Sequence, residues 1–104
     1  MPVTPLETKA DFDAAKAKDQ LVVVDFWATW CGPCRMVAPK IEAMSNEFPD
    51  VAFHKVDVDE NDEAAQDAGI KAMPTFKLYK SGKEVAELVG ANADKLKALV
   101  AQHK

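Results

Sequence analysis

The feature that most restricts the fold is a short apolar run, Leu21–Trp27, which reads LVVVDFW. A near-continuous apolar segment of this length is typical of a strand that is covered on both faces of its sheet. One residue breaks the pattern: Asp25 carries a charge, which is costly to bury in such a strand. The run therefore predicts a central strand and raises the question of what a carboxylate does inside it.

Strand and helix patterns alternate along the rest of the chain. Before the run, Thr8 and Asp11 resemble the capping box that begins a helix. After it, apolar residues follow a helical stripe at Val37, Ile41, Met44 and Phe48. Pro39 falls inside this second helix and should kink it. The segment Val51–Val58 reads as a further strand, and Gly69 can end the short helix after it.

The last third of the chain predicts a hairpin and a final helix. Thr75–Tyr79 and Glu84–Val89 are strand-like and are joined by the turn 80–83. Asn92 can cap the last helix, whose apolar face holds Leu96, Leu99, Val100 and His103. The resulting order β-α-β-α-β-α-β-β-α describes an α/β protein with a mixed sheet, parallel at its centre, helices on both faces and a hairpin at one edge.

Length and charge narrow the classes of function. A chain of 104 residues argues for a single domain, 1–104. The net charge of −4, from 17 acidic and 13 basic residues, argues against nucleic acid or an anionic membrane as the main partner. No apolar run approaches the ~20 residues of a membrane span. The start, MPVTPLETKADF, has no signal-peptide pattern, so we expect a cytosolic protein.

The chain has two cysteines, Cys31 and Cys34, in the sequence WCGPC. A disulfide between them would close a very small loop and add little stability, so a structural staple is not expected. The pair follows the central strand and begins a helix, where unpaired N–H groups and the macrodipole lower the pKa of the Cys31 thiol. Pro33 suits a first helical turn, and Gly32 allows another chain to approach closely.

Two other interpretations of the cysteines are a zinc site and a pair of inert buried thiols. Structural zinc needs four ligands, and neither His54 nor His103 has ligand spacing to the cysteines. A C-x-x-C pair beside a βαβ pattern favours a redox site. Cys31, expected to be exposed at the helix tip, would attack a substrate disulfide, and the shielded Cys34 would then resolve the mixed disulfide, leaving a Cys31–Cys34 disulfide.

The motif in its context resembles the thioredoxin family. WCGPC is preceded by VVVDFWAT and followed by AMPTF, and the segments VDVDEN, YKSGKEV and VGAN extend the resemblance over essentially the whole chain. In detail the chain is most similar to eukaryotic cytosolic thioredoxins. The resemblance implies the thioredoxin fold, with about five strands in a central mixed sheet and four helices on its two faces, and a protein disulfide reductase.

The resemblance also suggests a role for Asp25. Burial should raise the pKa of this carboxyl, so that it can accept a proton from Cys34 near neutral pH. From the residues alone, an exposed edge position or a hydrogen-bonded structural carboxylate is an equal alternative. Lys55 would ordinarily be a surface lysine, but in the family a lysine here lies near the aspartate and tunes it.

The family further implies a surface for substrate proteins around the cysteines. Pro74 would follow a cis peptide bond, and Met73 would offer its backbone to an extended substrate peptide. Trp27 is expected to pack beside the site rather than contact substrate. The docking surface implied by the resemblance comprises Trp30, Gly32, Pro33, Met73, Pro74, Val89, Gly90 and Ala91.

The expected partners follow from what the chain lacks. It has no nucleotide fingerprint and no site for a bound cofactor or metal, so electrons must come from another protein. The resemblance implies a thioredoxin reductase, which uses NADPH and FAD, and substrates such as peroxiredoxins, ribonucleotide reductase and methionine sulfoxide reductase. We expect a monomer. Two alternatives are a redox-dependent binding module and a disulfide oxidase or isomerase, although relatives of the latter kind usually carry His in place of Pro33.

Overall fold

The computed structural model describes residues 3–104 and has the predicted order of elements. The strands are β1 (Val3–Pro5), β2 (Val22–Trp27), β3 (Ala52–Asp57), β4 (Thr75–Lys80) and β5 (Lys83–Val89). The helices are α1 (Lys9–Lys16), α2 (Gly32–Glu47), α3 (Asp62–Ala68) and α4 (Ala93–His103). Each predicted strand and helix is therefore confirmed to within a few residues.

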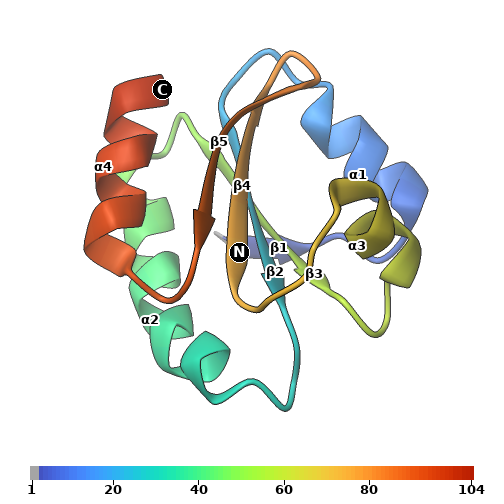
Figure 1. Cartoon of the computed structure of the whole chain (residues 1–104). Helices are drawn as coiled ribbons and strands as arrows, with labels where there is room; N and C mark the ends of the chain where they lie inside the picture. The colour runs from blue at the N-terminus through green and yellow to red at the C-terminus, as the bar shows by residue number, and fades with distance from the viewer. Residues whose placement is uncertain (1–2) are drawn as a thin grey trace.

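The strands form one sheet in the order β1-β3-β2-β4-β5. The strand β2 lies at its centre, parallel to β3 and antiparallel to β4. The prediction of a sheet that is parallel at its centre is thus only half right: the parallel pairs extend from the β1 edge to β2, and the hairpin β4–β5 supplies the antiparallel half. Figure 1 shows α2 and α4 on one face of the sheet and α1 and α3 on the other.

The central strand is buried because both faces of the sheet are covered. Val23 belongs to the core under α2 and α4, which also contains Ile41 and Leu96. Val24 belongs to the core under α1 and α3, together with Phe12. Side chains alternate between the two faces along a strand, so an uninterrupted apolar run can supply both cores at once.

The helix ends follow the signals in the sequence. The Thr8 hydroxyl accepts the Asp11 N–H at 3.1 Å, and the Asn92 side chain accepts the Lys95 N–H at 3.0 Å. Gly69 ends α3 in the left-handed conformation, with φ at 71°, which a residue without Cβ adopts at little cost. The helix α2 runs continuously through Pro39, so this proline does not end it.

Candidate active site

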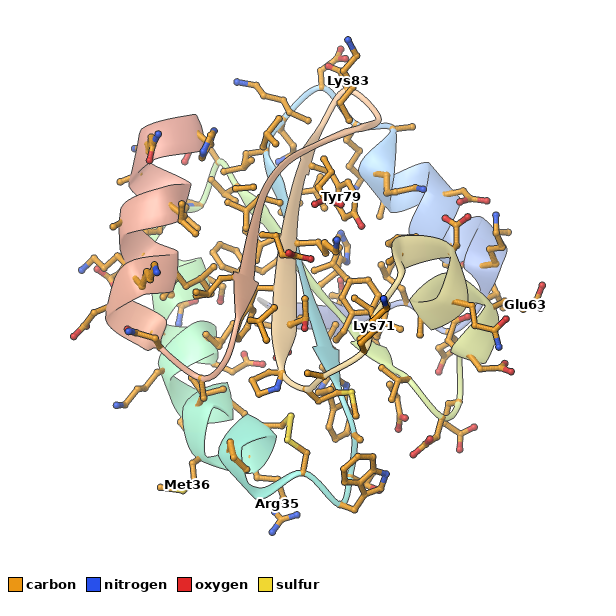
Figure 2. All side chains as sticks on the ribbon, in the orientation of Figure 1. Arg35, Met36, Glu63, Lys71, Tyr79 and Lys83 are labelled. Atoms are coloured by element: carbon orange, nitrogen blue, oxygen red, sulfur yellow. A yellow bond between two sulfur atoms is a disulfide. The ribbon has the colours of Figure 1, made fainter. Side chains whose placement is uncertain are left out.

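The two cysteines lie where the central strand gives way to α2. Cys31 is the N-cap of α2, and a disulfide joins it to Cys34, with 5.3 Å between the Cα atoms. The Cys31 sulfur accepts the backbone N–H of Cys34 at 3.2 Å. Figure 2 shows this disulfide at the lower end of the molecule, above Arg35 and Met36. The helix N-terminus therefore directs an N–H group at the Cys31 sulfur, where it would stabilise a negative charge.

The expectation that Cys31 is exposed is wrong for this oxidised form. Cys31 is 6% exposed and Cys34 is 2% exposed. Both pack with Ala28 in a small apolar cluster that Trp27, Val58 and Met73 complete. Two of these three residues, Val58 and Met73, come from segments distant in the sequence, and only a small part of Cys31 stays open to a partner.

Asp25 is buried in β2, as the resemblance implied and the residues alone left open. It is 6% exposed, and its Oδ1 atom has no hydrogen-bond partner among residues 3–104. Burial raises the pKa of this carboxyl to about 7, against a smaller lowering by the Lys55 charge. Asp25 is thus neither an exposed edge residue nor a fully hydrogen-bonded structural carboxylate. It can gain or lose a proton near neutral pH.

A cavity of about 80 Å³ connects the carboxyl with the second cysteine. Its lining includes Asp25, Cys34 and Lys55, together with Trp27, Arg35 and Ala38. Such a volume has room for water, which could relay a proton between the two groups. Of the two cysteines, only Cys34 lines this cavity, so a proton can pass between Asp25 and the second cysteine rather than the first.

Lys55 lies directly opposite Asp25 in the parallel pair of β2 and β3. Its ammonium nitrogen is 5.4 Å from the centre of the Trp27 ring, a distance at which a cation and an aromatic face attract. The positive charge favours the ionised carboxylate and so opposes the effect of burial on the Asp25 pKa. Trp27 packs beside the cysteines, as expected, and holds the lysine stem next to the cavity.

The loop before β4 completes the site from the opposite side. The Met73–Pro74 peptide bond is cis, as the resemblance implied. The Gly90 N–H donates to the Pro74 carbonyl at 2.9 Å, which ties this loop to the end of β5. Met73 packs against the cysteine cluster. Residues from the two ends of the hairpin therefore lie beside the disulfide.

Large apolar side chains surround the disulfide at the surface. Trp30 is 65% exposed and Val89 is 58% exposed, although their apolar character alone would favour burial. The Trp30 indole N–H donates to the Asp59 carboxylate at 3.0 Å, which fixes the ring in an outward position. Exposed apolar groups gathered around a reactive centre are typical of a protein interaction site.

Two residues of this surface were missed from the sequence. Met36 is 80% exposed and lines a groove with Pro33 and Ala91. The sequence did offer one signal for Met36: it is an apolar residue that directly follows Arg35 and lies outside the apolar stripe of the helix. No sequence pattern indicated Asp59, because its contact with Trp30 depends on how the β3–α3 loop folds back toward α2.

Two absences hold for the part of the chain that the structure describes. Among residues 3–104, no group of three or more His, Cys, Asp or Glu side chains is arranged to hold a metal ion. Within the same range, no helix has the length and apolar character needed to span a bilayer. The site holds an N-cap cysteine in a disulfide, a second cysteine, and a carboxyl with a raised pKa, which together can exchange two electrons and two protons with another thiol pair.

Comparison with known proteins agrees with this chemistry. The family model described as Thioredoxin matches residues 3–102. Thioredoxin from the sponge Geodia cydonium is 58% identical over 95% of this chain and 96% of its own length. Thioredoxin-1 of Saccharomyces cerevisiae is 54% identical, with coverage of 95% and 96%. The X-ray structure of Fasciola hepatica thioredoxin superposes with a TM-score of 0.93 at 50% identity, covering 97% of this chain and 99% of that one.

The fold and the site define a thiol–disulfide oxidoreductase. The chain belongs to the thioredoxin family, and these relatives are eukaryotic, as the sequence indicated. Thioredoxins are disulfide oxidoreductases that act with a thioredoxin reductase and disulfide-containing substrates, and the chain accordingly carries out dithiol–disulfide exchange through Cys31 and Cys34.

Proposed function

We propose that Cys31 is the nucleophile and Cys34 the resolving cysteine of a protein disulfide reductase. The observation that supports this assignment is the N–H of Cys34 directed at the Cys31 sulfur. A hydrogen bond to the thiolate lowers its pKa and favours attack by Cys31. Cys34 instead lines the partly open cavity that Asp25 also lines.

Asp25 accepts the proton of Cys34 when that thiol attacks the mixed disulfide, and Lys55 keeps the carboxyl ionised for this step. The raised pKa of Asp25, about 7, suits a general base that works at neutral pH. The proton moves within the cavity that both groups line. This role explains why a carboxyl without a partner for Oδ1 stands in the central strand.

The docking surface named above binds substrate proteins in an extended conformation. The exposed rings and methyl groups of Trp30 and Val89 supply apolar contacts, and the backbone of Met73 supplies hydrogen bonds to the substrate chain. Gly32 leaves open space, since a Cβ at this position would meet no other atom within 4 Å. A substrate disulfide can therefore come close to Cys31.

The chain acts as one monomeric thioredoxin domain, 1–104, in the cytosol. The family model covers residues 3–102, and the sheet joins strands from both ends of the chain. A thioredoxin reductase returns the disulfide to the dithiol with electrons from NADPH. Peroxiredoxins, ribonucleotide reductase and methionine sulfoxide reductase are the substrates that membership of the family suggests.

The reductase function is tested with insulin as a disulfide substrate. Catalytic amounts of the protein should speed the precipitation of insulin by dithiothreitol several-fold. NADPH and a eukaryotic thioredoxin reductase should replace dithiothreitol as the electron source, with one NADPH consumed for each disulfide reduced. No acceleration with either electron source would contradict the assignment. Binding of insulin without turnover would instead favour a binding module.

A further inference from the structure

Arg35, the single arginine of the chain, follows Cys34 directly in α2. Its guanidinium Nη1 donates to the backbone carbonyl of Thr29 at 2.7 Å. Thr29 belongs to the loop 28–31, which joins β2 to α2 and ends in Cys31. Figure 2 shows Arg35 at the same end of the molecule as the disulfide. The side chain thus connects the helix that carries Cys34 with the loop that carries Cys31.

Other hydrogen bonds also hold the loop 28–31, and two of them come from backbone N–H groups of α2: Arg35 donates to the Cys31 carbonyl and Cys34 to the Cys31 sulfur, each at 3.2 Å. The Cys31 N–H donates to the Ala28 carbonyl at 3.1 Å, within the loop itself. Trp30 donates to Asp59, which belongs to the β3–α3 loop. The two backbone bonds from α2 hold Cys31 at the end of the loop, whereas the Arg35 guanidinium holds its middle, at Thr29. Loss of the Arg35 side-chain bond would therefore release Thr29 from α2 and leave Cys31 attached.

Arg35 also forms part of the wall of the partly open cavity, together with Cys34 and Asp25. Because Arg35 is itself exposed, this part of the wall borders solvent. The pKa of Asp25 is raised because water is largely kept from the carboxyl. Any residue of the wall therefore influences how well the carboxylate is hydrated.

We propose that Arg35 is a positioning residue for the resolving step: it holds the loop 28–31 against α2 and closes the outer wall of the cavity shared by Cys34 and Asp25. This inference rests on the role proposed above for Asp25. In the resolving step the Cys34 thiol gives its proton to Asp25 and attacks the Cys31 sulfur. The Cys31–Cys34 bond forms, the bond from Cys31 to the substrate breaks, and the substrate leaves with both electrons of that bond as a thiolate.

Single-turnover reduction of a disulfide peptide, quenched with acid and followed by mass spectrometry, measures the two steps separately. In Arg35→Ala the mixed disulfide should form at a rate within about twofold of wild type and resolve roughly three- to tenfold more slowly, the effect of one hydrogen bond. The pH midpoint of the resolving step should move down, because water reaches Asp25 and hydrates its carboxylate. Arg35→Lys, which keeps a stem and an N–H donor, should recover most of the rate.

Lys83→Ala is the control for the loss of one positive charge, because Lys83 lies at the opposite end of the molecule (Figure 2). An unchanged resolving rate and pH midpoint in Arg35→Ala would overturn the proposal. Equal slowing of both steps would also overturn it, since Arg35 would then act in substrate docking. In a protein that already carries Asp25→Asn, the further change Arg35→Ala should not shift the pH midpoint of the resolving step. If Asp25→Asn alone resolves at the wild-type rate, the role of Asp25 is wrong, whatever Arg35 does.

Discussion

Asp25→Asn should stabilise the oxidised protein at pH 8 by about 4 kcal/mol and leave its stability at pH 4 almost unchanged. The folded protein raises the pKa of Asp25 to about 7, whereas an unfolded aspartate titrates near ~3.9. Each unit of difference corresponds to ~1.4 kcal/mol. Asparagine has the shape of the protonated acid and carries no charge at either pH.

The direction of this effect follows from which state holds the proton. Between the unfolded and folded pKa values the native protein keeps Asp25 protonated, while the unfolded chain has lost that proton. The free energy of unfolding therefore decreases as the pH rises from about 4 to about 7, and the full cost of an ionised, buried carboxylate is present above pH 7. A salt-bridged aspartate would show the opposite dependence.

Denaturant unfolding of wild type and Asp25→Asn at both pH values measures the difference. The same variant should slow resolution of the mixed disulfide by about a hundredfold at neutral pH, the lower end of what a positioned base contributes, with less effect on the first attack. Asp67→Asn, at an exposed carboxylate of α3, is the matched control. A variant that is less stable at pH 8 and turns over normally would make Asp25 a structural residue.

The two single cysteine variants should fail in different ways. Cys34→Ser retains the attacking sulfur but has no thiol to release the substrate, so it should accumulate a mixed disulfide with insulin. Cys31→Ser has lost the attacking sulfur and should accumulate none. Both variants should reduce insulin no faster than dithiothreitol alone, because turnover needs the two cysteines.

Non-reducing electrophoresis and mass spectrometry of the trapped species distinguish the variants. The mass should correspond to the protein plus one insulin chain in Cys34→Ser, and dithiothreitol should release it. Ser45→Ala, a buried hydroxyl of α2 away from the disulfide, controls for a change of packing in this helix. Equal trapping by both variants would show that either cysteine can attack first.

Local patterns were sufficient for most of the fold. The run Leu21–Trp27 became the central strand because its alternate residues supply the cores on both faces of the sheet. Thr8, Asn92 and Gly69 mark helix ends through hydrogen bonds or backbone geometry within a few residues of themselves. The extent of the parallel pairing was not predictable in this way, because it depends on which strands become neighbours.

In the candidate site, too, the features set by local sequence could be predicted and those set by distant contacts could not. The N-cap position of Cys31 follows from the sequence around it, whereas the burial of Asp25 was favoured only by the resemblance to the family. The low exposure of Cys31 does not follow from the sequence around it, because Met73 covers it from a loop far along the chain. The contacts of Trp30 with Asp59 and of Arg35 with Thr29 likewise depend on how loops meet after folding.

Alkylation of the reduced protein tests the assignment of the two cysteines most directly. Iodoacetamide at about pH 6.5, with peptide mapping over time, reports the thiolate fraction and access of each sulfur separately. We predict that Cys31 is modified much faster than Cys34. The Cys34 N–H and the helix N-terminus stabilise the thiolate of Cys31. Equal rates, or faster modification of Cys34, would contradict the account.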